Sequence, residues 1–281
     1  MENSMNNPLS KYFRQPAIYL QLPSKGKYWP DGSVELPVNG ELPIYPMTTK
    51  DEIILRTPDA LLNGNGVVDV IQSCCPSIKD AWKTPSVDVD AILIAIRIAT
   101  YGNKMPIETT CPHCQTKNDN ELDLQGALNS IRAPEYNEFD VNGLKVKLVP
   151  QPFFGANRDS SIEFAEQKLR QALELPDTDP KVRADELAKS LQRLIDVTTD
   201  AITDSTEYIL LPDGVTVSDK AHIKEFYQNA DRTFINSIQA EVTNLNQEGG
   251  IPPNKVLCDD CTKEYEVPVL FDYARFFGVG S

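Results

Sequence analysis

The chain has 281 residues, enough to bury a core in one large domain or two smaller ones. Apolar residues make up 41% and charged residues 24%, a composition that argues against wholesale disorder. The formal net charge of −14 argues against a general nucleic-acid binder and against an anionic membrane surface, because both need clustered Lys and Arg. No apolar run approaches the roughly 18 residues of a bilayer span. We therefore expect a chain that works in the reducing cytosol and binds neither nucleic acid nor membrane.

The first segment, residues 1–50, is rich in Pro, Gly and aromatic residues and shows little helical periodicity. Short extended pieces are expected at 17–22, 34–37 and 42–45, because Pro and Gly interrupt the pattern between them. We interpret residues 1–50 as an extended docking segment.

Residues 51–154 are predicted to hold helices, a metal-binding turn and a hairpin. The expected helices cover 51–56, 67–73 and 89–101; Thr48 or Thr49 caps the first and Gly102 ends the last. A strand at 106–110 follows. Asn142-Gly143 lies between alternating apolar residues and tolerates positive φ, so a hairpin is predicted over 139–149.

Residues 155–250 are predicted to form a mainly helical insertion. Apolar residues recur with a 3.6-residue period over 162–172 and 187–202, as in half-buried helices. A hairpin at 208–217 and two further helices follow, one capped by Ser218 and one along 234–245. Gly249-Gly250 and Pro252-Pro253 end the last helix. Residues 251–281 complete the chain with a second cysteine pair, a strand and an aromatic tail at 271–277.

Four of the six cysteines form two Cys-x-x-Cys pairs, Cys111 with Cys114 and Cys258 with Cys261. Two intervening residues let a tight turn point both sulfurs at one tetrahedral ion. Two such turns, or knuckles, supply the four thiolates of a closed, structural zinc ribbon. The sequence therefore predicts one structural Zn²⁺ bound by these four residues.

Other interpretations of these residues stay open at this point. The four cysteines could be reduced core residues, one pair could be a redox site, or all four could hold an iron–sulfur cluster. His113 could replace a cysteine ligand, although residues inside a knuckle usually point to solvent.

The spacing of the two pairs predicts the architecture. About 143 residues separate them, so the helical segment must leave the ribbon and return to it. We expect an α+β fold, in which a small β-rich N-terminal part and a four-cysteine zinc ribbon are split by a mainly helical insertion.

Catalytic motifs are missing from the sequence. It contains no Gly-x-Ser-x-Gly, His-Glu-x-x-His or Walker pattern, and Cys74 and Cys75 are adjacent, which favours core packing over chelation. We expect no enzymatic activity and no small-molecule substrate.

Several segments, in order, resemble the baseplate hub and hub-assembly proteins of T-even-type contractile-tailed phages. They are 22–30 (Leu-Pro-Ser-Lys-Gly-Lys-Tyr-Trp-Pro), 46–52 (Pro-Met-Thr-Thr-Lys-Asp-Glu), and 95–102 followed by the first cysteine pair. The series covers roughly residues 18–150, and the second pair fits too. The resemblance implies a non-enzymatic component of the virion tail baseplate, assembled in the host cytoplasm in contact with other hub or wedge proteins.

The proline- and aromatic-rich start is expected to contribute to that interface through Leu22, Pro23, Tyr28, Trp29 and Pro30. Aromatic residues are common interface anchors, and a backbone fixed by Pro loses little entropy on docking. Local packing of Tyr28 and Trp29 is the competing interpretation. The alternative function is a zinc-ribbon nucleic-acid-binding or regulatory protein, which would need a basic face.

Overall fold

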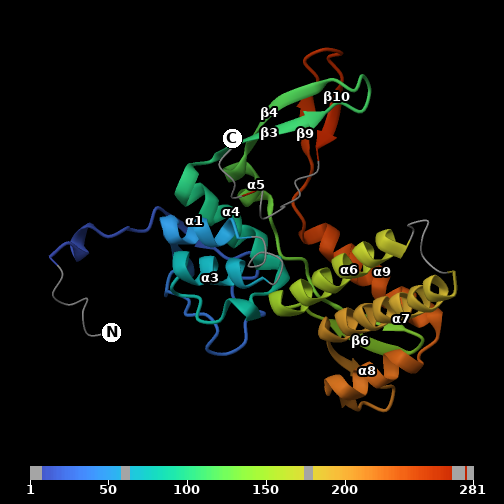
Figure 1. Cartoon of the computed structure of the whole chain (residues 1–281). Coiled ribbons are helices and arrows are strands. Elements are labelled where there is room, and N and C mark those ends of the chain that lie inside the picture. Colours follow the sequence, from blue (N-terminus) through green and yellow to red (C-terminus); the bar gives the residue numbers. More distant parts are fainter. Residues whose placement is uncertain (1–7, 58–63, 174–179, 268–275, 277–281) are drawn as a thin grey trace.

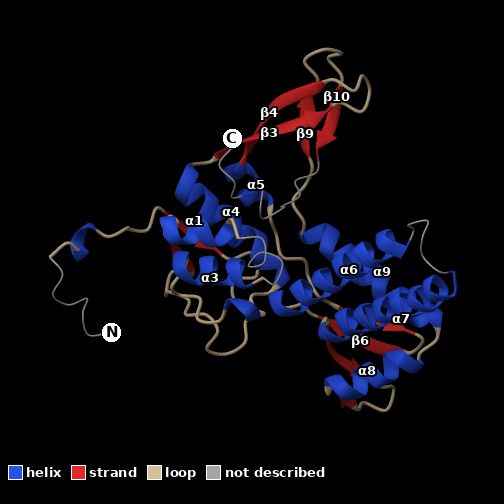
Figure 2. Ribbon diagram, in the orientation of Figure 1, coloured by secondary structure: helices blue, strands red, loops and turns tan. Residues whose placement is uncertain are grey.

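The computed structural model describes residues 8–57, 64–173, 180–267 and 276. It has an N-terminal body, a ribbon of β-hairpins and a helical body built on a sheet (Figures 1 and 2). The N-terminal body contains β1 (Ile18–Gln21), β2 (Glu41–Ile44), α1 (Thr49–Leu55), α3 (Asn65–Cys74), α4 (Ser86–Tyr101) and α5 (Leu124–Ser130). The ribbon contains β3 (Lys104–Thr110), β4 (Lys117–Asp123), β9 (Asn254–Leu257) and β10 (Glu264–Val267). The helical body contains β5 (Glu138–Val141), β6 (Leu144–Leu148), α6 (Phe153–Leu173), α7 (Pro180–Asp204), β7 (Thr206–Leu210), β8 (Thr216–Val217), α8 (Lys220–Asn229) and α9 (Arg232–Gly249). The expected α+β class is confirmed.

Helix α4 is the centre of the N-terminal body. Residues from Ala91 to Ile96 are all fully buried, so the helix is surrounded by the core rather than lying on it. Arg97 is a buried charged residue of this helix: its guanidinium donates to the carbonyl of Phe276 and lies over the rings of Phe276 and Tyr101. Gly102 ends the helix with φ of 89°, as the sequence predicts.

The segment at residues 22–30 packs against α4 and corrects part of the docking expectation. Leu22 and Trp29 are buried in the core, so their side chains are not available to a partner. The carboxylate of Asp88 on α4 accepts hydrogen bonds from the Ser24 amide (2.8 Å), the Ser24 hydroxyl and the Trp29 indole Nε1 (2.7 Å). A buried carboxylate with three donors is well satisfied, and it holds the segment to the helix.

The other three residues of that expectation lie nearer the surface. Pro30 is exposed, and Pro23 and Tyr28 are half-buried. The ring of Tyr28 meets the ring of Tyr136 edge-on at 5.2 Å, and both belong to the second core, in the helical body. The segment therefore links the two bodies, and only part of it faces solvent.

The helical body rests on an antiparallel four-stranded sheet of order β5-β6-β7-β8. The two predicted hairpins are confirmed, but Val146 of the first pairs with Ile209 of the second. The segment boundary expected between residues 154 and 155 therefore separates β6 from β7, which are neighbouring strands of one sheet. Helices α8 and α9 supply Ile223, Tyr227 and other residues to its core.

Helices α6 and α7 form an antiparallel pair whose contact is largely polar. Arg193 donates to the buried carboxylate of Glu166, and Arg170 donates to the buried Ser190 hydroxyl at 3.3 Å. Leu191 and Ile195 are 55% and 58% exposed. The predicted helices are present, but this part of the stripe predicted to be half-buried faces outward.

Other local expectations differ from the structure. Residues 34–37 form no strand, since Val34 makes only an isolated bridge to Ile78. Strand β4 and helix α5 were not predicted. The cap of α8 is Asp219 rather than Ser218, because the Asp219 carboxylate accepts from the His222 amide. The aromatic tail expected at 271–277 lies outside the described residues except for Phe276.

Candidate metal centre

The two cysteine pairs lie at the tips of two hairpins, β3-β4 and β9-β10, which stand side by side (Figures 1 and 2). The four Sγ atoms of Cys111, Cys114, Cys258 and Cys261 all lie within 4.8 Å of one another. None of the four is in a disulfide. The structure thus brings together the four residues that the spacing pointed to, across more than half of the chain.

The sulfur separations fit a tetrahedral ion. Cys111 Sγ lies 3.7 Å from Cys261 Sγ, and Cys114 Sγ lies 3.4 Å from Cys258 Sγ. Zn–S bonds of about 2.3 Å in a tetrahedron require sulfurs about 3.8 Å apart. Four sulfurs at this spacing leave no coordination position for a substrate, so the arrangement suits a structural ion.

The two knuckles have the same backbone pattern. In the first, the Cys111 amide donates to Thr116 O (2.9 Å) and the Cys111 carbonyl accepts from Gln115. In the second, the Cys258 amide donates to Lys263 O (3.0 Å) and the Cys258 carbonyl accepts from Thr262. Each turn closes through one residue at positive φ, Gln115 at 63° and Thr262 at 54°. Non-glycine residues rarely adopt this conformation, so a strong local constraint must hold both turns.

Protein contacts between the two hairpins are few. The hydroxyls of Thr109 and Tyr265 lie 2.6 Å apart, and the Asp259 amide donates to Asn118 Oδ1 at 2.8 Å. The apolar cluster of the ribbon consists of the four cysteines with Tyr265, Val256 and Val267. So small a core cannot hold two hairpins together, which makes a bound ion the natural source of their stability.

The thiol pKa values differ strongly around the site. Hydrogen bonds from Thr116 lower the pKa of Cys114 to about 6, and the Cys261 amide lowers that of Cys258. The pKa of Cys261 rises to about 12: the Lys263 amide lowers it, but burial and the neighbouring sulfurs raise it more. Four thiols so close cannot all ionise alone, because like charges repel, whereas a divalent cation lets all four become thiolates.

The other candidate residues lie apart from this centre. His113 is exposed within the first knuckle, as predicted, and it does not belong to the cluster of four cysteines. Cys74 and Cys75 are buried in the N-terminal core, where burial raises their thiol pKa values to about 12 and about 11. Neutral thiols of this kind act as small apolar side chains, which confirms the predicted core packing.

Comparisons with known proteins identify the family of the chain. No helix among the described residues has the length and apolar character needed to cross a membrane. Neither a curated protein nor a solved structure matches the chain. The model of one family, described as T4 bacteriophage base plate protein, matches residues 18–278, a range that contains both knuckles. The chain belongs to this family of T4-type phage baseplate proteins.

Proposed function

We propose that the chain is a non-catalytic structural or assembly component of the hub region of a contractile-tail baseplate, and that a four-cysteine Zn²⁺ site stabilises its ribbon. The observation that carries the proposal is the family match over residues 18–278, joined to a metal centre with all four positions filled by sulfur. Such a centre offers no open position for chemistry.

The zinc ion supplies folding free energy rather than reactivity. Cys111 and Cys114 would bind it from one hairpin and Cys258 and Cys261 from the other. Hydrogen bonds already favour the thiolate forms of Cys114 and Cys258. Binding there ties the start of the helical body to its end, because the chain leaves the ribbon after β4 and returns at β9.

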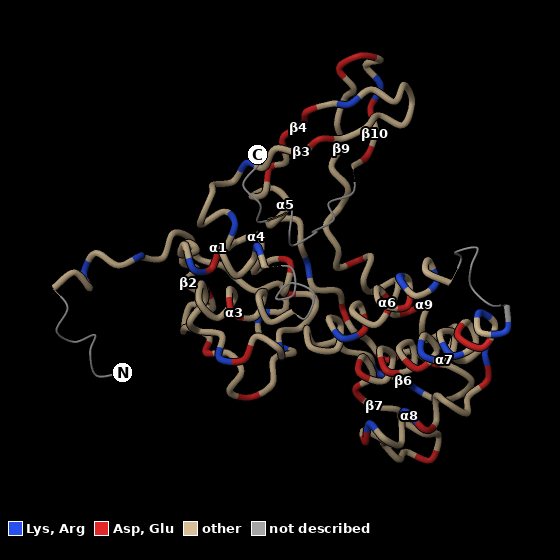
Figure 3. The backbone as a smooth tube through the Cα atoms, in the orientation of Figure 1, with Lys and Arg blue, Asp and Glu red and all other residues tan. Residues whose placement is uncertain are grey.

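Charge favours protein partners over nucleic acid. Lysines of the ribbon lie beside carboxylates: Lys104 beside Glu121 (2.6 Å), Lys117 beside Glu108 (2.8 Å) and Lys255 beside Glu264 (3.7 Å). Figure 3 shows acidic and basic residues mixed along the chain. With a net charge of −14, these features support contacts with other hub or wedge proteins in the virion tail, after assembly in the host cytoplasm.

The test compares two substitutions in the knuckles. Cys258→Ser removes a proposed ligand, whereas His113→Ala changes an exposed residue of the other knuckle. We expect purified wild type and His113→Ala to contain one zinc per chain and Cys258→Ser to contain much less. In cells infected by a phage lacking this protein, supplied wild type should sediment with baseplate intermediates, and Cys258→Ser should do so poorly.

Two results would contradict the proposal. A zinc-free wild type, or a His113→Ala protein that also loses zinc, would refute the four-cysteine site. Absence of the wild type from baseplate intermediates, together with salt-dependent DNA binding, would favour the nucleic-acid-binding alternative instead.

A further inference from the structure

Strand β1 has a free edge on the side away from β2. Among the described strands it pairs with β2 alone, and Tyr19 of β1 lies opposite Pro43 of β2. Because Pro43 has no N–H, these two residues cannot exchange hydrogen bonds, so the ladder is made by Ile18 and Leu20. The N–H and C=O groups of Tyr19 and Gln21 therefore point away from β2.

The outward backbone groups of β1 are available to another chain. Neither Tyr19 nor Gln21 makes a backbone hydrogen bond on this side within the described ranges. Both residues are exposed, whereas Leu20 between them is buried in the core and holds the strand in place. An unpaired strand edge of this kind is a template for pairing with a further strand.

The composition of β1 sets it apart from the other strands at sheet edges. Charged residues, proline and very short length all discourage pairing with a foreign strand. Strand β2 contains Glu41 and Pro43, β5 contains Glu138 and Asp140, and β8 has two residues. Each strand of the ribbon contains at least one Lys or Glu. Strand β1, Ile-Tyr-Leu-Gln, has none of these protective features.

A groove of about 500 Å³ adjoins the free edge. Tyr19 and Gln21 line one side and Leu128 of α5 lines the other, while no described residue of β2 takes part. Lys25 and Arg132 also line the groove, and its described lining contains no Asp or Glu. Neither cation has an ion-pair partner in the described part of the chain. In a chain of net charge −14, two such cations favour an acidic occupant.

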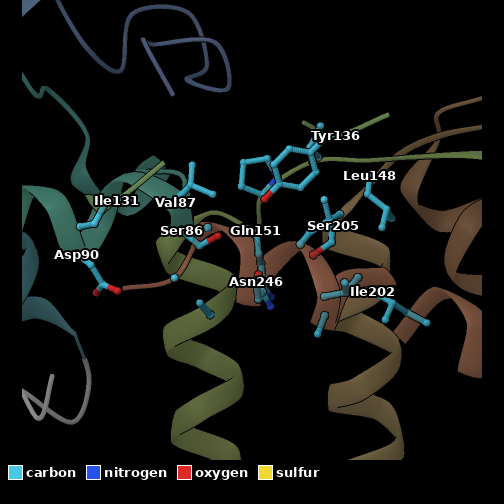
Figure 4. Close-up of a pocket in the computed structure, with 18 of the residues that line it drawn as sticks. Ser86, Val87, Asp90, Ile131, Tyr136, Leu148, Gln151, Ile202, Ser205 and Asn246 are labelled. Carbon is cyan, nitrogen blue, oxygen red and sulfur yellow. The ribbon is translucent and has the colours of Figure 1, made fainter. Parts of the chain in front are cut away.

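A second large cavity, of about 410 Å³, lies where the N-terminal and helical bodies meet (Figure 4). Asp90 of α4 lines it on one side and Ile202 of α7 on another. Figure 4 shows Asp90 apart from Ser205 and Asn246, so the polar groups of this cavity do not converge on one point. The groove beside β1, by contrast, combines a free strand edge with two unpaired cations.

We propose that an extended segment of a neighbouring baseplate protein adds to the free edge of β1 as a further strand and brings a carboxylate to Lys25 and Arg132. The backbone of Tyr19 and Gln21 would give the segment its hydrogen bonds, and the two cations would select an acidic sequence. That the segment belongs to a baseplate protein rests on the proposed function; strand addition itself does not.

The geometry of a strand predicts the sequence of the partner segment. The partner residue between the two that bond Tyr19 and Gln21 would lie beside Leu20 and face the same side of the sheet. Because Leu20 is buried, this residue should be apolar. A second copy of the chain joined edge to edge fits less well, because its β1 would bring another Lys25 and Arg132 and no carboxylate.

Binding of synthetic peptides to the full chain tests strand addition. The probe is the acetylated peptide Thr-Val-Thr-Val-Thr-Glu-Glu. One control ends in Lys-Lys, and another is N-methylated at each Thr, which removes backbone donors and keeps the side chains. We expect the Lys-Lys peptide to bind at least about fivefold more weakly than the acidic peptide and the methylated peptide not to bind. The acidic peptide should also slow amide hydrogen exchange at Tyr19 and Gln21.

Matched charge reversals test the two cations. Lys25→Glu and Arg132→Glu change exposed residues of the groove, whereas Lys50→Glu changes an exposed residue of α1 outside it. We expect Lys50→Glu to bind the acidic peptide as wild type does, and the other two variants to bind it at least about fivefold more weakly. Arg132→Glu should also enter baseplate intermediates less than Lys50→Glu does.

Four outcomes would overturn the inference. Equal binding of the methylated and unmethylated peptides would exclude strand addition, and equal binding of the acidic and Lys-Lys peptides would exclude charge selection. Dimers of the chain that the acidic peptide dissociates would assign the edge to a second copy. Normal entry of Arg132→Glu into baseplate intermediates would refute the baseplate partner. If wild type itself fails to enter them, the proposed function fails, whereas the peptide results still decide whether β1 accepts a strand.

Discussion

Replacing Asp90 by Asn should stabilise the protein, and the gain should grow with pH. Asp90 has a pKa near its ordinary 3.8 when the chain is unfolded and about 6 when it is folded. The folded state therefore holds its proton over a pH range where the unfolded state has lost it. Stability from this group is highest below the unfolded pKa and is lost as pH rises through the folded pKa.

The two pKa values give the size of the effect. Ionisation of Asp90 costs about 1.6 kcal/mol of folding free energy at pH 5 and about 3 kcal/mol at pH 7.5. Asn does not titrate, so Asp90→Asn should gain about 1.4 kcal/mol relative to wild type between these pH values. Any constant cost of burying the amide cancels in that difference.

Tryptophan fluorescence during urea unfolding is a suitable assay, because both tryptophans report on the region around α4. Trp29 donates to Asp88, and Trp82 stacks on Phe153 at 5.7 Å. Asp69→Asn serves as the control for loss of one acidic charge at an exposed site. If the stability difference between Asp90→Asn and wild type stays constant from pH 5 to pH 7.5, Asp90 does not titrate as its burial implies, and the electrostatic reasoning fails.

Three further substitutions test other parts of the structure. Trp29→Phe leaves the Asp88 carboxylate one donor short and should cost about 1–3 kcal/mol of stability, read from Trp82 fluorescence; no loss would mean that the hydrogen bond is not formed. Phe276→Ala removes a buried ring that lies over Arg97, and we expect a loss of about 3–5 kcal/mol with faster amide hydrogen exchange in α4. Cys258→Ser should speed exchange throughout β3, β4, β9 and β10 while the helical body keeps its protection; uniform protection would show that the ribbon is stable without metal.

The cluster of four cysteines could be predicted from sequence because its signal is local. Two residues between paired cysteines define a turn whatever the rest of the chain does, and the strand-like lead-ins orient each turn. The hairpin at Asn142-Gly143 and the stop at Gly102 were predictable for the same reason, since each depends on the backbone freedom of one or two residues. For the two cysteine pairs to meet, the inserted helical segment only had to end close to the point where it begins.

The role of residues 22–30 was not predictable from the local pattern. The hydrogen-bond acceptor of Trp29 is Asp88, 59 positions further along the chain. No residue near Trp29 in the sequence indicates that Asp88 is a buried acceptor. A proline- and aromatic-rich segment has the same composition whether it docks on another protein or on its own chain.

Helix α7 shows what a periodic sequence pattern leaves undetermined. Its apolar period predicted the helix correctly, but periodicity does not say what the apolar face contacts. The α6–α7 contact uses Glu166 and Arg193, which left Leu191 and Ile195 at the surface. Asp90 was missed because it belongs to a helix whose pattern is strongly apolar, and only the meeting of two bodies gives this residue a cavity to line.

The separation of the two knuckles along the chain has a consequence for biosynthesis. Residue 258 leaves the ribosome 147 positions after residue 111, a delay of about 7 to 30 s at ordinary elongation rates. During that interval Cys111 and Cys114 have no partner pair from the second knuckle, and by its end the sheet and helices between the knuckles are complete in sequence. The helical body can therefore fold first, and capture of the ion becomes the closing step. If the ion is zinc, as we propose, its scarcity in the cell would delay only this last step and leave chains with a folded middle and open hairpins.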